Sequence, residues 1–192
     1  MTSDTATRMP DVVDSIISRA SAVTIKEPGP TPDDLRLILK AGTRAPDHGK
    51  LQPWRFVVIE GTARDRLGDF MAQRLKVRMP NAEEIELKRE RDKVFRAPTI
   101  VAVAAKVSGE KIPAIEQHSA TAAAAQNCIL AAHALGYGTM WKTGDPAYDD
   151  EVKKFLGLDA ADAIIGFLYI GTADVMPKNV RETKLDEVIS HL

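Results

Sequence analysis

The residues best suited to chemistry in this chain are four cationic side chains near the ends of predicted elements, with one hydroxyl close to the first of them. They are Arg19, Arg44, His48, Lys142 and the hydroxyl of Ser21. Guanidinium and ammonium groups donate charge-assisted hydrogen bonds, and a phosphate needs several such donors. Taken singly, each residue is more often solvated surface charge. If the fold brings them together, they indicate a site for a phosphate-bearing ligand.

The sequence lacks the motifs of several common enzyme sites. No G-x-G-x-x-G follows the first predicted strand and no G-x-x-x-x-G-K-[ST] occurs, which excludes Rossmann dinucleotide binding and P-loop phosphoryl transfer. G-x-S-x-G and H-E-x-x-H are also absent, so neither a hydrolase nor a zinc protease has support. An anion in this protein must therefore be held by a local cluster of side chains.

Cys128 is the only cysteine, and its alanine-rich surroundings indicate a packing role. His133, five residues later, falls on a different face of a helix, so the two are poorly arranged as a catalytic pair. A single cysteine also excludes an intramolecular disulfide and a multi-cysteine metal centre. It indicates a reducing, cytoplasmic compartment, and we expect no metal ion.

Length and charge limit the kinds of partner. With 192 residues, 44% hydrophobic and 28% charged, the chain suits one folded domain over 11–192, preceded by a disordered stretch at 1–10. The 26 basic and 27 acidic residues leave a net charge of -1, which creates no field for nucleic acid. No segment has the pattern of a signal peptide or membrane span. We therefore expect neither a nucleic-acid nor a membrane partner.

The first half of the chain alternates helical and strand patterns. Thr31 and Pro32 suit the cap and first turn of a helix, and Pro46 should stop that helix at Ala45. Helices are thus predicted at 11–19, from 31 to 45 and, as two charged pieces, within 62–96, with buried strands at 55–60 and 99–105.

The second half has a sharper change of composition. It predicts a packed alanine-rich helix over 119–135, a short strand at 138–143, a helix between Asp145 and Gly157, and a last buried strand at 163–170 closed by Gly171-Thr172. Gly136 suits the left-handed cap of the alanine-rich helix. Interleaved strands and helices predict an α/β sandwich, but the pattern leaves open whether its sheet is parallel, antiparallel or mixed.

Two adjacent motifs have a specific likeness. The turn from Arg44 to His48 has the sequence Arg-Ala-Pro-Asp-His, and Gln-Pro-Trp follows at 52–54. In these motifs the chain resembles the nitroreductase family, and in particular its compact bacterial NAD(P)H nitroreductases. Further landmarks fall in order: Arg-Ala-Ser at 19–21, Leu-Gly-Tyr-Gly at 135–138, Trp-Lys-Thr at 141–143 and a strand bounded by glycines at 166–171.

The resemblance implies an α/β (α+β) sandwich of the nitroreductase type, with a central sheet flanked by helices, and a homodimer whose C-terminal tail crosses to the partner. It also implies FMN at each of two sites on the subunit interface. The implied FMN ligands are Arg19, Ala20 and Ser21 with Trp141, Lys142 and Thr143 of one chain, and Arg44 and His48 of the other. The implied approach of NADH or NADPH is along Ala131, Ala132, His133, Ala134, Leu135 and Gly136.

The activity implied by the resemblance is hydride transfer from NAD(P)H, through FMN, to a nitroaromatic, quinone or similar small acceptor in ping-pong order. Because FMN carries the redox chemistry, no catalytic side chain is expected. A flavin-binding protein or redox scaffold without turnover stays open as an alternative, as does a dehydrogenating or dehalogenating enzyme on the same fold.

Two positions depart from the pattern of the family. Ala20 and Lys142 stand where relatives often have arginine. Because lysine lacks the bidentate geometry of a guanidinium, we expect a weaker hold on phosphate.

Overall fold

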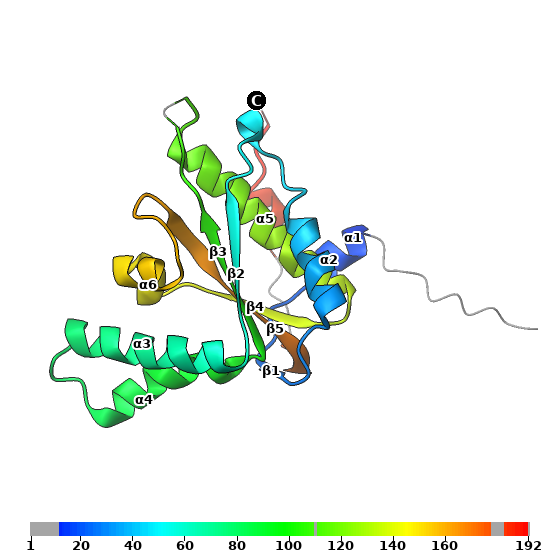
Figure 1. Ribbon diagram of the computed structural model, residues 1–192. Helices are drawn as coiled ribbons and strands as arrows, with labels where there is room; N and C mark the ends of the chain where they lie inside the picture. The colour runs from blue at the N-terminus through cyan, green and yellow to red at the C-terminus, as the bar shows by residue number, and fades with distance from the viewer. Residues whose placement is uncertain (1–11, 110, 178–182, 192) are drawn as a thin grey trace, which may run out of the picture.

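The computed structural model describes residues 12–109, 111–177 and 183–191. Figure 1 shows a central sheet with helices on both of its faces, which confirms the predicted α/β sandwich. The disorder expected for residues 1–10 falls outside the described residues.

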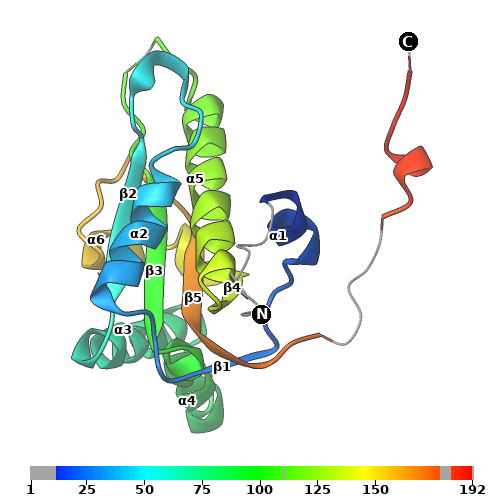
Figure 2. The same ribbon diagram turned by 90° about the vertical axis from the view of Figure 1, so that its right-hand side faces the viewer.

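The elements follow the predicted order. The helices are α1 (Val12–Ser18), α2 (Pro32–Gly42), α3 (Thr62–Arg78), α4 (Glu84–Asp92), α5 (Ala114–Ala134) and α6 (Asp150–Phe155). The strands are β1 (Thr24–Lys26), β2 (Trp54–Ile59), β3 (Thr99–Ala105), β4 (Gly138–Lys142) and β5 (Ala163–Val175). Short 3-10 turns lie at His48–Lys50, Lys93–Arg96, Asp145–Tyr148 and Leu185–Glu187. Helices α1, α2 and α5 lie on one face of the sheet, and α3, α4 and α6 on the other (Figures 1 and 2).

Every strand pairing among the described residues is antiparallel, which answers the question that the sequence pattern left open. β2, β3 and β5 are neighbours in that order. β5 also pairs with β4 through 167–171 and with β1 through 172–175. The long β5 therefore carries two short partners in succession.

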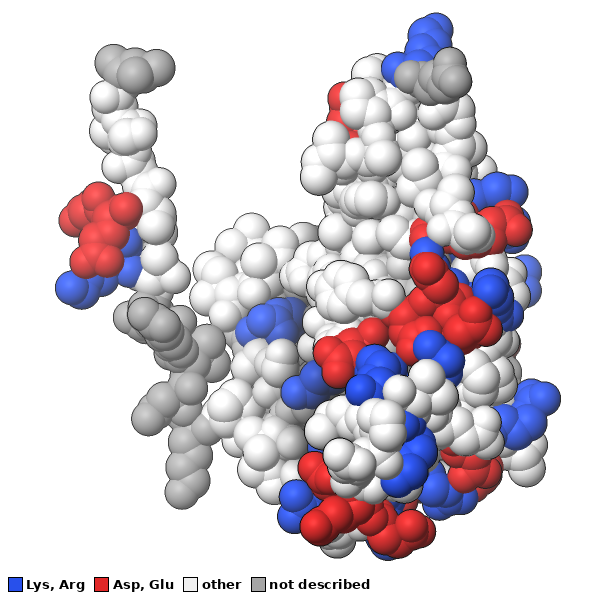
Figure 3. All heavy atoms as spheres, turned by 90° about the vertical axis from the view of Figure 1, so that its left-hand side faces the viewer, with Lys and Arg blue, Asp and Glu red and all other residues white. Residues whose placement is uncertain are grey.

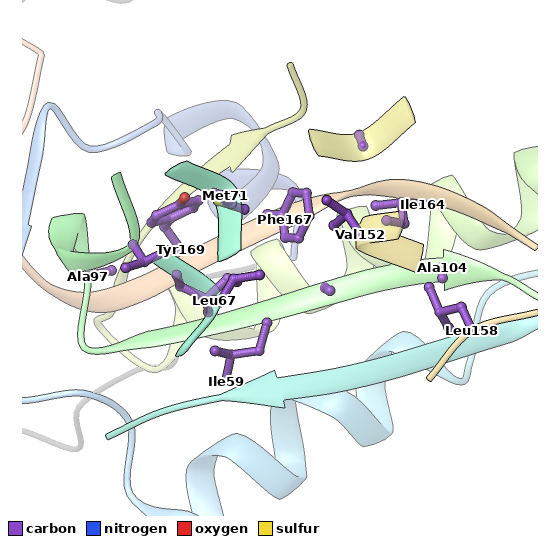
Figure 4. Close-up of a cluster of buried hydrophobic side chains, with 14 of the residues drawn as sticks. Ile59, Leu67, Met71, Ala97, Ala104, Val152, Leu158, Ile164, Phe167 and Tyr169 are labelled. Atoms are coloured by element: carbon purple, nitrogen blue, oxygen red, sulfur yellow. The ribbon is translucent and has the colours of Figure 1, made fainter. Parts of the chain in front are cut away.

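Alternate residues of β5 point into two separate hydrophobic cores. Figure 4 shows the first core, in which Phe167 and Tyr169 pack with Leu67 and Met71 of α3. Leu168, between the two aromatic residues, belongs to the second core against α5 and α2. All seven residues of the central strand β3 are buried, because helices cover both of its faces.

Local signals placed the start of α2 correctly but not its end. Thr31 caps the helix by accepting a hydrogen bond from the N–H of Asp34 at 3.1 Å. The prediction that the helix reaches Ala45 is wrong, because it ends at Gly42. The N–H of Arg44 donates to Ala41 and that of Ala45 to Gly42, so tight turns replace the helical ladder before Pro46 is reached.

The strand predicted at 55–60 is correct in place but wrong in burial. β2 lies at the edge of the sheet and pairs only with β3, so several of its side chains are half-exposed. The alanine-rich helix is also longer than predicted, because α5 begins at Ala114, directly after Pro113, rather than at 119.

The prediction that Gly171 and Thr172 close the last strand is also wrong. β5 continues to Val175 because β1, which the sequence analysis missed, pairs with this extension. Gly171 has a packing role instead, since a Cβ there would come within 2.6 Å of the Pro98 ring. Glycine within a strand often marks such a close approach rather than a turn.

Candidate functional site

The segment that follows α1 runs beside β4. The N–H of Ala22 donates to the carbonyl of Thr139 at 3.0 Å, so Arg19, Ala20 and Ser21 lie between α1 and the outer edge of this strand. β4 ends at Lys142. The structure therefore places segment 19–21 directly before a residue that contacts β4, the strand that carries Trp141 and Lys142.

Successive residues of β4 point to opposite faces of the sheet. Trp141 packs against the second core, and its indole N–H donates to the carbonyl of Ile165 at 3.2 Å. A Cβ at Gly166 would overlap the Trp141 ring, so glycine is required there for the indole to lie flat on the sheet. Lys142 points to the other face, where it lines a cavity with Phe167 and Tyr169.

This cavity, called the β4 cavity below, has a volume of about 360 Å³ and contains two cationic residues that the sequence analysis missed. It is lined by Met71, Lys93, Arg96, Trp141, Lys142, Thr143, Gly144, Pro146, Phe167 and Tyr169. Lys93 and Arg96 lie on the 3-10 turn directly before β3. They are cations at the end of an element, like the four residues that were selected, and that rule would have found them.

The charges of the β4 cavity are only partly compensated. Nζ of Lys93 lies 2.5 Å from Oε2 of Glu90, which is 6% exposed and whose Oε1 has no hydrogen-bond partner among the described residues. Arg96 and Lys142 form no ion pair with any described residue. Burial raises the pKa of Tyr169 to about 12, so its hydroxyl stays protonated at neutral pH. The cavity therefore combines excess positive charge with an aromatic floor.

Arg44 lies on the opposite face of the sheet. It lines a mainly apolar cavity of about 380 Å³ between α1, α2 and α5. Ala131 and Ala134, from the segment predicted to meet the nicotinamide cofactor, line the same cavity, together with Val12, Ser15, Ile16, Ala41, Asn127 and Leu130. The structure thus brings Arg44 to part of the predicted nicotinamide segment and not to the β4 cavity of its own chain.

His48 lies in a third place, near the start of α5. Its Nδ1 lies 2.5 Å from Oε2 of Glu116, and both side chains are substantially exposed. Next to it, Asp47 accepts a hydrogen bond from the N–H of Gln52 at 2.6 Å, which ties the Arg-Ala-Pro-Asp-His turn to the Gln-Pro-Trp motif. Within one chain, the predicted FMN ligands are divided among three regions of the surface.

The end of α5 has the geometry expected from its sequence. Gly136 adopts a left-handed φ of 86° after the helix, Ala132 is buried, and Leu135 is exposed. Nε2 of His133 lies 3.2 Å from the Ser18 hydroxyl, so this histidine joins α5 to α1.

Cys128 is fully buried, and burial raises the pKa of its thiol to about 12, which confirms the predicted packing role.

Among the described residues, no group of His, Cys, Asp and Glu side chains has the arrangement of a metal site. No helix in the described part of the chain combines the length and the apolar character that crossing a membrane requires. Figure 3 shows acidic and basic residues interspersed on the α3 and α6 side of the molecule, so positive charge is concentrated locally rather than over this face.

Comparison with known proteins gives consistent results. The model of the nitroreductase family matches residues 25–172. The Escherichia coli K12 protein "Putative NAD(P)H nitroreductase YdjA" is 37% identical over 163 residues, which cover 84% of this chain and 88% of that protein. A Haemophilus influenzae protein, "Putative NAD(P)H nitroreductase", is 30% identical over 177 residues, covering 91% and 94%.

Solved structures share the fold. The nitroreductase-like family protein of Bacillus cereus superposes with a TM-score of 0.82 at 27% identity and covers 100% of this chain and 98% of its own. A Bacteroides fragilis nitroreductase, whose structure contains bound FMN, superposes with a TM-score of 0.73 at 22% identity over 95% and 98% of the two chains.

Proposed function

This chain belongs to the nitroreductase family, and from that premise we propose that it is a homodimeric FMN-dependent oxidoreductase that transfers hydride from NAD(P)H to a nitroaromatic, quinone or similar acceptor. The observation that carries the proposal is the β4 cavity, where the family-like segment 141–143 meets an aromatic floor and uncompensated positive charge. The names of YdjA and of the Haemophilus protein support NAD(P)H as electron donor.

The residues present fit an FMN phosphate. Arg19, Arg44 and Lys142 form no ion pair with any described residue, whereas Arg74, Arg78 and Arg91 all pair with aspartates. Cations without a protein counterion are available to a ligand, and the Ser21 hydroxyl adds a neutral donor. We assign the phosphate to Arg19, Ser21 and Lys142 of one subunit, joined by Arg44 of the partner subunit. His48, which is paired with Glu116, is proposed as a contact to FMN away from the phosphate.

A second copy of the chain is needed to complete this site. Val12, Val13, Ile16 and Ile17 of α1 are 50% to 73% exposed, although their spacing forms the apolar stripe of an amphipathic helix. Such a stripe beside an apolar cavity is typical of a protein interface. A partner that covers α1 also brings its own Arg44, which lines the cavity beside α1, to the interface, as two-fold symmetry requires.

The C-terminal segment supports the same arrangement. Leu185, Val188 and Ile189 are exposed in the single chain, and Figure 2 shows residues 183–191 leading away from the sandwich. Their i, i+3, i+4 spacing presents three apolar side chains together. We propose that this segment packs on the partner subunit, where burial supplies the stability that it lacks on its own chain.

The mechanism divides the work between cofactor and protein. When bound, FMN supplies the redox chemistry, so the protein needs no nucleophile. Arg19 and Lys142 fix the phosphate end by charge, and Trp141, held by its hydrogen bond to Ile165, forms a rigid wall. Small side chains at Ala131 and Ala134 leave room for the nicotinamide ring to approach. We propose ping-pong turnover, in which NAD(P)⁺ leaves before the acceptor is reduced.

The first test measures FMN uptake by the purified protein through the quenching of flavin fluorescence. The loaded protein is expected to lose its flavin colour anaerobically with NADH or NADPH and to regain it when menadione or a nitroarene is added. Full FMN occupancy without NAD(P)H oxidation would favour the alternative of a non-catalytic flavin-binding protein. A folded preparation that takes up no FMN would refute both. The buried single cysteine is compatible with the cytoplasmic location that we propose.

A further inference from the structure

The β4 cavity has features that phosphate binding by Arg19 and Arg44 does not explain. Arg44 lies on the α5 face of the sheet, and the segment containing Arg19 follows α1 on that same face. Arg96 lies on the opposite face, on the 3-10 turn that follows α4. The chain therefore has positive charge on both sides of the β4 edge.

No described residue neutralises the charge of Arg96. Three cations line the β4 cavity, Lys93, Arg96 and Lys142, and the Glu90 carboxylate compensates only Lys93. Because Glu90 is almost fully buried, it holds Lys93 in place, while Arg96 is exposed and free to turn toward a ligand. Because Lys142 is assigned to the FMN phosphate, Arg96 is the cation of the cavity that remains without a counterion among the described residues, and it favours a further anion.

The apolar side chains of the cavity indicate what the uncharged part of that ligand should be. Phe167, Tyr169 and Met71 form an aromatic and apolar surface. The Tyr169 hydroxyl lines the cavity, forms no hydrogen bond with any described residue, and can donate one to an anionic oxygen. A flat apolar molecule with one acidic group matches this combination of aromatic surface, guanidinium and hydroxyl.

We propose that the β4 cavity binds the acidic group of the electron acceptor through Arg96, so that the preferred acceptors are aromatic carboxylates or similar aryl anions. The proposal rests on the proposed function and deepens it by naming the acceptor class. For a nitroarene carboxylate, a hydride from NAD(P)H and one proton reduce the nitro group to nitroso. One N–O bond breaks, the oxygen leaves as water, and NAD(P)⁺ is released.

Binding without turnover gives the first test. FMN-loaded protein without NAD(P)H is titrated calorimetrically with 4-nitrobenzoate and with its neutral analogue 4-nitrobenzamide. We expect the carboxylate to bind about tenfold more tightly, as one charge-assisted hydrogen bond to a guanidinium allows. Arg96→Gln should reduce this preference to about twofold or less. Arg89→Gln, on the exposed side of α4, removes the same charge outside the cavity and should keep the preference.

Kinetics give a second and independent test. The ratio of kcat/KM for the carboxylate to that for the amide should fall about tenfold in Arg96→Gln and stay unchanged in Arg89→Gln. Raising the ionic strength should lower the ratio in the wild type, because the cavity is open to solvent.

Three outcomes would overturn the proposal. Equal binding and turnover of both compounds by the wild type would refute the acceptor class while the oxidoreductase function stands. A rise in the KM for NADPH but not for NADH in Arg96→Gln would assign the anion to the donor's phosphate instead. Loss of all NAD(P)H oxidation in the FMN-loaded wild type, with equal affinity for both compounds, would refute the proposed function as well.

Discussion

The two faces of the sheet are formed by the same strands, but they differ in how their charged and apolar side chains are arranged. On the α3 face, charged residues are paired within the chain: Arg91 with Asp69 at 2.5 Å and Arg74 with Asp149 at 2.9 Å. On the α5 face, helix α1 exposes an apolar stripe, and Arg44 lines an apolar cavity. The α3 face thus neutralises several of its charges within one chain and leaves Arg96 and Lys142 of the β4 cavity without a counterion among the described residues, whereas the α5 face leaves an apolar stripe exposed. This contrast supports our proposals that the α5 face associates with a partner subunit and that the β4 cavity on the α3 face binds an anionic group.

The contrast also explains why Lys142 is unusual. It belongs to β4, which joins the two faces, because Trp141 points toward α5 and Lys142 toward the β4 cavity. A ligand that reaches over this edge can contact a partner subunit on one side and the α3 face on the other. We therefore expect the contacts to the proposed ligand to lie at the edge of the sheet formed by β4, rather than on either face alone.

Breaking the association face should have the largest effect. Ile16→Asp places a charge in the exposed stripe of α1, and a two-fold interface would bury that charge twice. We expect at least about a 100-fold loss of self-association, or about 3 kcal/mol, measured by light scattering over a dilution series. FMN affinity should fall with it, because each site needs both chains.

Val77→Asp is the matched control for this change. Val77 is an exposed apolar residue of α3, on the other face of the sheet. The variant should stay dimeric and bind FMN as the wild type does. A dimeric Ile16→Asp variant with normal FMN binding would remove α1 from the interface.

The next largest effect should come from the phosphate donors. Arg19→Ala or Lys142→Ala is expected to weaken FMN binding by about 1.5 to 3 kcal/mol, because each removes a charge-assisted hydrogen bond. Fluorescence quenching of FMN measures the change, with Arg89→Ala as a control of equal charge. Lys142→Arg should strengthen binding, since a guanidinium restores bidentate geometry. Unchanged FMN affinity in both alanine variants would show that Arg19 and Lys142 are ordinary surface charges and do not bind the phosphate.

The sequence predicted what is determined locally. The Thr31 cap, the buried β3 and the left-handed Gly136 all depend on neighbours within a few positions, and all are found where expected. The length of β5 was not predictable in this way. Its extension depends on pairing with β1, which comes from the other end of the chain and is too short to have a pattern of its own.

The candidate site was predictable only where a motif or an element end marked it. Arg44 and Lys142 were selected by that means. Arg96 and Lys142 line one cavity because both side chains lie on the side of the sheet where Phe167 and Tyr169 point, and sequence spacing does not contain that tertiary arrangement. Part of the proposed site also depends on a second chain, which no pattern within one chain can specify.

A smaller effect tests the packing that positions Trp141. Gly166→Ala is expected to lower the free energy of unfolding by about 1 to 3 kcal/mol, because the new Cβ would overlap the indole ring. Trp141 should move, which its fluorescence would report. Gly61→Ala is the contrasting variant: nothing lies within 4 Å of its Cβ, and only its φ of 51° opposes the change. It should cost about 1 to 3 kcal/mol through backbone strain but leave the fluorescence of the indole unchanged. Equal effects on both measurements would contradict the packing role of Gly166.

The smallest effect concerns the ion pairs that complete the α3 face. Burial by itself raises the pKa of Asp149, but hydrogen bonds from Arg74 and from the backbone of α6 outweigh it and hold the pKa below its ordinary value of 3.8. A carboxyl group with a lowered pKa in the folded state stabilises the fold above its ordinary pKa, and this stabilisation is lost as the pH falls further. Asp149→Asn keeps the cap of α6 but removes the charge. Urea unfolding between pH 5 and pH 3 should therefore show a shallower decline of stability in Asp149→Asn than in the wild type. A constant difference between the two over that range would show that the Arg74–Asp149 pair does not contribute to the acid sensitivity of this face.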